Sequence, residues 1–352
     1  PTCTSIFEEG LRLPVLQLVR DGKFIPDVLE MIRINNRLPI EQEGDLRSQY
    51  NALLVGARQL ERLVKRYGPE VVRGCIDELD RRSEAQMRQR ISSIPDGTYT
   101  ASDLMDDDGL TEDPLPLELA ITIDGDELRL DFEGSAPACT GPMNMSRVTT
   151  VTACHTGLKH LFPEIPINAG CFRPVQIDIP AGSLLDAQPP RAVGGYADVS
   201  ARIVGLISQA LAKAMPLDAA GTSFETGGVA VISGEKVGGG VFVAAFPYGG
   251  GYGGRAGEDG LVNGTSVVGM ATFPSIETSE RDMPVRWHRF GIRAGSGGSG
   301  RWAGGCGNEY DFSVEVPTDL SILGDQSITP PAGVHGGRPG APNKVEYQVN
   351  GQ

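Results

Sequence analysis

The feature that most constrains how this chain folds is a glycine-dense run from Phe246 to Gly260, which reads FPYGGGYGGRAGEDG and holds seven glycines. Glycine allows positive φ angles and lets the backbone approach another backbone or a ligand closely. The run therefore predicts an unusual backbone path. Charged side chains lie within it, at Arg255, Glu258 and Asp259, and they indicate a binding site.

The composition narrows the class of protein. The chain has 352 residues, 47 of them glycine, and a formal net charge of −14. An acidic chain argues against a general nucleic-acid or anionic-membrane binder, because neutralising phosphates requires a surplus of Lys and Arg. No apolar run approaches the ~18 residues of a spanning helix, and no signal peptide opens the chain. The six cysteines form no CxxC pair. We therefore expect reduced thiols and a cytoplasmic protein without nucleic-acid or membrane partners.

Two long helices are predicted near the N-terminus. From Asp45 to Gly68 the apolar residues recur at helical spacing, with Asp45 as the expected N-cap and Gly68 as the stop signal. Pro69 then suits the first position of a second helix that continues to about Ile94. The pair is predicted to form a helical hairpin with charged outer faces.

Strand signals dominate from residue 96 onward. Apolar and polar residues alternate from Leu117 to Phe132 around the turn Asp124-Gly-Asp, which predicts a β-hairpin. Short strands separated by glycines are expected towards the C-terminus, one of them at Ser266–Ala271. These signals predict an α+β fold: an N-terminal helical segment (1–95), an α+β middle region (96–220) and a strand- and glycine-rich mixed-sheet region (221–352).

A search for familiar chemistry finds no complete catalytic set. Two stretches match G-x-G-x-x-G, at 249–254 and 295–300, but the glycine-rich sequence after each cannot begin the helix that would hold a pyrophosphate. His155 and His160 lie about 140° apart around their predicted helix, so they do not face one ion. We expect neither nucleotide nor metal binding by this chain alone.

Long motifs nevertheless follow one another along almost the whole chain. They include IFEEGLRLP at 6–14, DFEGS at 131–135, INAGCFRPV at 167–175, GGYADVSAR at 194–202, GGGYGGRAGEDG at 249–260, GSGGSGRWAGGCG at 295–307 and GGRPGAP at 336–342. In this order they resemble the B-type subunits of ATP-dependent hydantoinases and 5-oxoprolinases. Those subunits are related to the larger subunits of acetone and acetophenone carboxylases.

The resemblance implies a reaction and its partners. An A-type subunit would use ATP to phosphorylate a substrate amide or enol oxygen, and the B-type subunit would complete the chemistry at a divalent metal. In the family, an N-terminal portion that carries His and Asp metal ligands precedes the region matched here. Metal and ATP would therefore be bound by other chains or segments of a hetero-oligomer. A start at Pro1 is compatible with a split gene, a cleavage or a truncated polypeptide.

The leading hypothesis is the C-terminal part, or a split subunit, of an ATP-dependent cyclic-amide hydrolase. It would supply substrate-cavity walls and partner interfaces for a small-molecule substrate. The candidate substrate contacts are Glu9, Arg12, Asp198, Arg202, Arg255 and Asp259. The family usually has Asn at Tyr196 and Glu-Thr at Asp198-Val199. If this segment contacts the substrate, these departures imply a ligand that differs from the commoner hydantoin-like ones. The alternatives are a ketone carboxylase subunit and a non-catalytic scaffold.

Overall fold

A four-stranded sheet organises the middle of the chain in the computed structural model, which describes residues 2–269 and 271–349. Its strands lie in the order β3 (Gly97–Met105), β4 (Leu115–Asp124), β5 (Glu127–Asp131) and β6 (Val175–Asp178). The first two pairs are antiparallel, and β5 and β6 are parallel. A parallel pair requires a crossover, and helix α4 (Arg147–Leu161) and the short helix η1 (Gly170–Phe172) lie within it.

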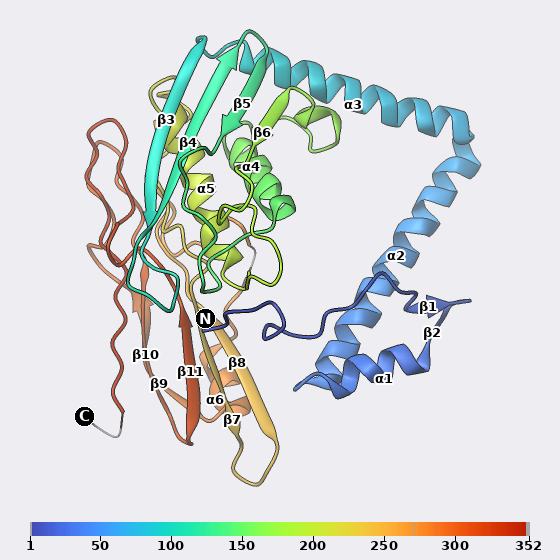
Figure 1. The fold of residues 1–352 in the computed structure, drawn as a ribbon, viewed down its shortest axis with the longest axis vertical. Helices are drawn as coiled ribbons and strands as arrows, with labels where there is room; N and C mark the ends of the chain where they lie inside the picture. Colours follow the sequence, from blue (N-terminus) through green and yellow to red (C-terminus); the bar gives the residue numbers. More distant parts are fainter. Residues whose placement is uncertain (1, 270, 350–352) are drawn as a thin grey trace.

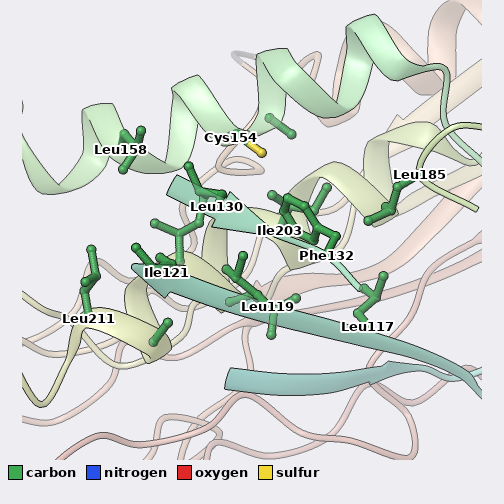
Figure 2. Close-up of a cluster of buried hydrophobic side chains, with 14 of the residues drawn as sticks. Leu117, Leu119, Ile121, Leu130, Phe132, Cys154, Leu158, Leu185, Ile203 and Leu211 are labelled. Atoms are coloured by element: carbon green, nitrogen blue, oxygen red, sulfur yellow. The ribbon is translucent and has the colours of Figure 1, made fainter. Parts of the chain in front are cut away.

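The main hydrophobic core fills the space between this sheet and two helices. Strand β4 alternates along its length, so that Leu117, Leu119 and Ile121 are buried on one face. Helix α5 (Tyr196–Leu211) packs against both the sheet and α4, and most of its residues are buried. Figure 2 shows side chains from the sheet and both helices meeting in this layer. Helix α5 is therefore held on two sides.

The C-terminal part is built from two smaller sheets. One has the strand order β11 (Thr318–Leu323), β7 (Val229–Glu235), β8 (Val241–Pro247), and the other pairs β9 (Val285–Ile292) with β10 (Asn308–Val314). The short helix α6 (Ile276–Asp282) precedes β9. Phe246, Phe273 and Trp287 form the centre of an aromatic cluster, with ring centroids 5.2–5.7 Å apart. These contacts form a second core.

The N-terminal helices form an arm that stands away from the rest of the molecule (Figure 1). The arm comprises β1 (Val19–Arg20), β2 (Lys23–Phe24), α1 (Pro26–Ile34), α2 (Pro39–Tyr67) and α3 (Pro69–Ile91). Helix α2 buries none of its residues. Helix α3 is anchored through its C-terminal half, where Met87 and Ile91 enter the main core. The two long helices diverge from Gly68, so they do not pack side by side along their lengths.

The α+β class and the pair of long helices are confirmed. The predicted helical hairpin is wrong, because α2 and α3 diverge from their junction and do not pack antiparallel (Figure 1). Two local predictions are also corrected. Helix α2 begins at Pro39 instead of Asp45, because proline at the first helical position and Glu41 in the first turn favour an earlier start. The strand predicted at Ser266–Ala271 is wrong for residues 266–269, which form a loop and turn; residue 270 lies outside the described residues. Within the described ranges, no helix has the length and hydropathy needed to cross a lipid bilayer.

Candidate functional site

Three glycine-rich segments meet at one place in the C-terminal part. They are residues 249–254, 296–305 and 331–343. Backbone hydrogen bonds join them directly: Gly305 N donates to Tyr252 O at 2.9 Å, and Arg338 N donates to Ser299 O at 2.8 Å. The glycine-dense run is therefore one of three segments that pack together. We call these three segments the glycine wall.

Close backbone approach explains why these positions are glycine. A Cβ atom at Gly253 would lie 1.8 Å from the carbonyl oxygen of Gly221, and one at Gly251 would lie 1.8 Å from that of Gly305. Both obstacles are backbone atoms, so no side-chain rotation relieves the clash. The wall can pack this tightly only without side chains.

The glycine wall borders an open cavity of about 360 Å³, and the lining side chains that can carry a charge near neutral pH are all basic. They are Arg255, Arg293, Arg301, Arg338 and His335. Among the described residues, no Asp or Glu lines this cavity, although the chain as a whole carries a net charge of −14. Gln326 also lines it; the residue is 2% exposed, and its Nε2 has no hydrogen-bond partner in the part of the chain that the structure describes. The cavity is therefore a cationic compartment in an acidic protein.

A second cavity of about 310 Å³ shares part of the same wall. Gly221, Tyr252, Gly253 and Arg255 line both spaces. The second cavity is mostly acidic and contains the carboxyl groups of Asp218, Glu225, Glu258 and Asp259. Among the described residues, the acidic side chains therefore line only the second of the two adjoining cavities, whereas Arg255 borders both.

A buried ion cluster lies near the acidic cavity. Arg202, on α5, is 1% exposed; its Nε donates to Asp325 at 2.8 Å and its Nη1 to Asp103 at 3.0 Å. Its Nη2 donates to Thr329 Oγ1 at 3.1 Å. Burial lowers the pKa of Arg202, but the charges of Asp325 and Asp103 outweigh this effect and raise it. Arg202 therefore joins α5 to β3 and to the segment after β11.

Two further carboxyl groups complete the buried cluster. Asp198 accepts hydrogen bonds from Thr226 Oγ1 and, at 2.9 Å, from Gly227 N, and burial raises its pKa to about 6. Glu225 is 2% exposed, and neither of its oxygens accepts a well-formed hydrogen bond from the described residues. Burial raises the pKa of Glu225 well above its usual range and so favours the neutral form of this carboxyl group.

The raised pKa of Glu225 predicts a particular pH dependence of stability. In the unfolded chain a glutamate ionises near pH 4.3, whereas burial moves the ionisation of Glu225 to higher pH in the fold. Its contribution to folding stability is therefore complete below that pH and is lost as the pH rises towards the raised pKa. We expect Glu225→Gln, which is always neutral, to melt at a higher temperature than wild type at pH 8 and at a similar temperature at pH 4. Each unit of pKa difference corresponds to about 1.4 kcal/mol.

Thermal denaturation between pH 4 and pH 8 measures this difference, and Glu112→Gln is the control. Glu112 is exposed and lies in a loop, so this variant should follow the wild-type profile at every pH. A Glu225→Gln profile parallel to wild type would show that Glu225 is ionised in the fold.

The structure places the six sequence-predicted contacts in four different settings. Asp198 and Arg202 lie in the buried ion cluster. Glu9 accepts hydrogen bonds from the backbone N–H groups of Val193, at 2.9 Å, and Gly194, just before α5. Arg12 is exposed, with its guanidinium over the Phe7 ring at 5.1 Å. Their role in substrate contact stays a prediction.

Arg255 and Asp259 are the predicted contacts that border the cavities. Arg255 forms an ion pair with Glu258. Asp259, which follows the first glycine segment, accepts a hydrogen bond from Ala303 N at 2.7 Å and so links this part of the glycine-dense run to the second segment. Both carboxylates lie on the acidic cavity, and Arg255 borders both spaces.

Sequence reasoning missed Arg301 and Arg338, although a signal for them existed. Each glycine segment carries an arginine directly after glycine: Arg255 in GGR, Arg301 in SGR and Arg338 in GGR. All three line the cationic cavity. The acidic partners of Arg202 had no such signal, because they come from segments distant in sequence.

Metal ligands do not gather within the described residues. No three His, Cys, Asp or Glu side chains converge there in a way that would hold an ion. The divalent metal implied by the resemblance therefore does not fit the residues of this part of the chain, and we derive no step at a metal from them.

Comparison with known proteins shows where the chain belongs. It is 27% identical to the B-type subunit of a putative D-/L-hydantoinase from Pseudomonas sp. (strain NS671), over 98% of this chain and 60% of that protein. The crystal structure of the ATP-dependent caprolactamase from Pseudomonas jessenii matches with a TM-score of 0.81 and 28% identity, over 88% of this chain and 55% of that one. A nucleotide-free acetone carboxylase structure shares the fold, with a TM-score of 0.84 at 19% identity over 92% of this chain and 46% of that one.

Two facts define the extent of this likeness. The chain spans about 60% of the length of the hydantoinase protein that it matches. The family model described as hydantoinase B/oxoprolinase matches residues 1–352, so the chain belongs to the hydantoinase B/oxoprolinase family.

Proposed function

We propose that this chain is part of an ATP-dependent cyclic-amide hydrolase of the hydantoinase/oxoprolinase type, and that the cationic cavity holds the substrate or its ring-opened product. The observation that carries the proposal is the cavity itself. At about 360 Å³ it lies at the small end of ligand pockets, as a small cyclic amide requires. Its basic lining suits a molecule that gains negative charge during the reaction.

Ring opening supplies that negative charge. Water adds to the amide carbon, the C–N bond breaks with the nitrogen taking up a proton, any phosphoryl group on the amide oxygen leaves as phosphate, and the opened chain carries a new carboxylate. Positioned guanidinium groups stabilise negative charge more strongly in a site that excludes water than in bulk solvent. In this scheme Arg255, Arg301 and Arg338 orient the carbonyl end of the ligand and bind the carboxylate as it forms.

The remaining functions are assigned to partners. We propose that an A-type subunit supplies ATP-dependent activation, and that a B-type N-terminal segment supplies a divalent metal and its ligands. Support comes from the relatives: the matched hydantoinase protein is longer than this chain, and the matched caprolactamase is described as ATP-dependent. The assembly would be a hetero-oligomer in the cytoplasm.

Reconstitution with co-purifying chains tests the proposal. We expect ATP turnover by the complex to rise on addition of a hydantoin, 5-oxoproline or a lactam. Arg255→Ala should lower kcat/KM about tenfold or more, because a charge-assisted hydrogen bond contributes roughly 1.5–3 kcal/mol. Arg62→Ala, an exposed arginine on α2, is the control and should leave turnover unchanged.

Two outcomes would contradict this function. ATP turnover that requires bicarbonate and a ketone, with none on cyclic amides, would identify a carboxylase subunit. Unchanged turnover in Arg255→Ala and in matching Arg301 and Arg338 variants, with assembly dependent on the chain, would identify a scaffold.

A further inference from the structure

We propose that the cationic cavity is a binding site for the anionic group of a small molecule, a carboxylate or a phosphate, recognised by Arg293, Arg301, Arg338 and the side-chain amide of Gln326. The inference deepens the proposed function by naming the ligand group. It rests on that function only for the identity of the whole molecule, since the anion site itself follows from the geometry.

Separation of charge is the first observation. The acidic residues nearest in sequence to Arg255, namely Glu258 and Asp259, line the second cavity and not this one. No carboxylate of the described residues therefore neutralises the cationic lining from inside the cavity. A cleft lined by one sign of charge focuses its field and concentrates ligands of opposite charge. In a chain with a net charge of −14, this local excess is the reverse of the average surface.

The individual arginines retain donors for a ligand. Arg293 uses Nη1 to donate to Pro342 O at 2.8 Å, which fixes the guanidinium at the wall. Arg301 lies over the Trp302 ring, 4.7 Å from its centroid. Within the described residues, the guanidinium of Arg338 forms no ion pair. An arginine presents five N–H donors in a planar fork that matches carboxylate and phosphate oxygens.

Gln326 provides an independent indication of a ligand. Its side chain is 2% exposed, and the buried Nε2 has no hydrogen-bond partner among residues 2–269 and 271–349. An unpaired buried donor is unfavourable, because it has lost its hydrogen bonds to water. Its backbone adopts φ = 68°, and Asn343 N donates to its carbonyl oxygen at 2.8 Å, so the residue is held in place. An acceptor oxygen from a ligand would satisfy this donor.

The glycine wall limits what kind of anion fits. In the part of the chain that the structure describes, no helix begins directly after either of the first two glycine segments. The wall therefore does not present the helix N-terminus that binds a pyrophosphate. Side-chain cations and one amide are the donors instead. This arrangement suits a single carboxylate or phosphate group on a small ligand.

Trp302 offers a direct measurement on the full chain. It lines the cavity, whereas Trp287, the other tryptophan of the sequence, lies in the aromatic cluster and is 9% exposed. We expect inorganic phosphate or acetate, added at constant ionic strength, to change the tryptophan fluorescence saturably, and sodium chloride to have no such effect. Trp302→Phe should abolish the signal, and calorimetry should still detect binding to that variant.

Variants decide the outcome. Arg338→Gln should raise the dissociation constant of the bound probe about tenfold or more, measured by calorimetry, and Arg338→Lys should restore part of the affinity. Arg62→Gln changes the net charge equally and lies on the arm, so it should bind like wild type. Thermal melting checks that each variant is folded.

Each outcome of the binding experiments has one interpretation. Saturable binding of phosphate alone assigns a phosphoryl group, binding of acetate alone assigns a carboxylate, and binding of both assigns a general anion site. Absence of binding to the folded chain, or equal affinity in Arg338→Gln and wild type, would overturn the proposal. Anion binding in a complex without amide turnover would overturn only the proposed function.

Discussion

Gly253→Ala should destabilise the protein by about 3 kcal/mol, at the upper end of the cost of overpacking. The new Cβ would lie 1.8 Å from the carbonyl oxygen of Gly221, and relief requires the backbone of one segment to move. Gly251→Ala should behave in the same way, because its Cβ would meet the Gly305 carbonyl oxygen at 1.8 Å. Denaturant unfolding of both variants measures the loss.

Gly307→Ala is the matched control. Gly307 lines the same cavity, but the nearest atom to its Cβ would be Ser296 Oγ at 3.8 Å, an ordinary contact distance. We expect a change within about 0.5 kcal/mol. If Gly253→Ala were as stable as Gly307→Ala, the segments would not be packed backbone to backbone, and the cavity as described would be wrong.

The second large effect is expected at Arg202. Arg202→Met removes the cation that lies among the carboxyl groups of the buried cluster, those of Asp103, Asp198, Glu225 and Asp325. Removal of one partner from a buried ion pair leaves an uncompensated charge and costs roughly 3–5 kcal/mol. We expect a loss of this size by denaturant unfolding at pH 7, with part of the stability recovered at pH 5 as the carboxyl groups are protonated.

A surface ion pair provides the comparison. Arg289 pairs with Glu309 at 3.0 Å, with side chains 60% and 42% exposed, so Arg289→Met should cost less than about 1 kcal/mol. Equal losses in the two variants would mean that solvent reaches Arg202. An Arg202→Met protein with normal stability and no activity would instead favour the substrate contact predicted from the sequence.

Local sequence patterns were sufficient to predict elements that are determined by residues close together in the sequence. The β4–β5 hairpin follows from alternation and from Gly125, which adopts φ = 60° at the turn. The boundary between α2 and α3 follows from Gly68 and Pro69. The strand predicted at Ser266–Ala271 was wrong for residues 266–269. Val267 and Val268 favour strands locally, but no neighbouring strand pairs with these residues.

The site was predictable only in part, because most of it is formed by segments that are distant in the sequence. Glycine density located one wall of the cavity, and Arg255 within it. An arginine directly after glycine marks Arg301 and Arg338 in the sequence, but this pattern does not show that they lie beside Arg255, because backbone hydrogen bonds between distant segments bring them there. The partners of Arg202 likewise come from β3 and from the segment after β11. Groups of residues like these are brought together by tertiary contacts, which the periodicity of the sequence does not reveal.

The position of the glycine wall near the C-terminus determines when the cationic cavity can form during synthesis. A ribosome delivers the chain from the N-terminus, and early parts can fold while later ones are still being made. The main core draws almost entirely on residues 87–215, so it can assemble early. The cavity needs residues up to Asn343, and the ion cluster needs Asp325. A nascent chain can therefore carry a folded scaffold for some time before the cationic cavity is complete.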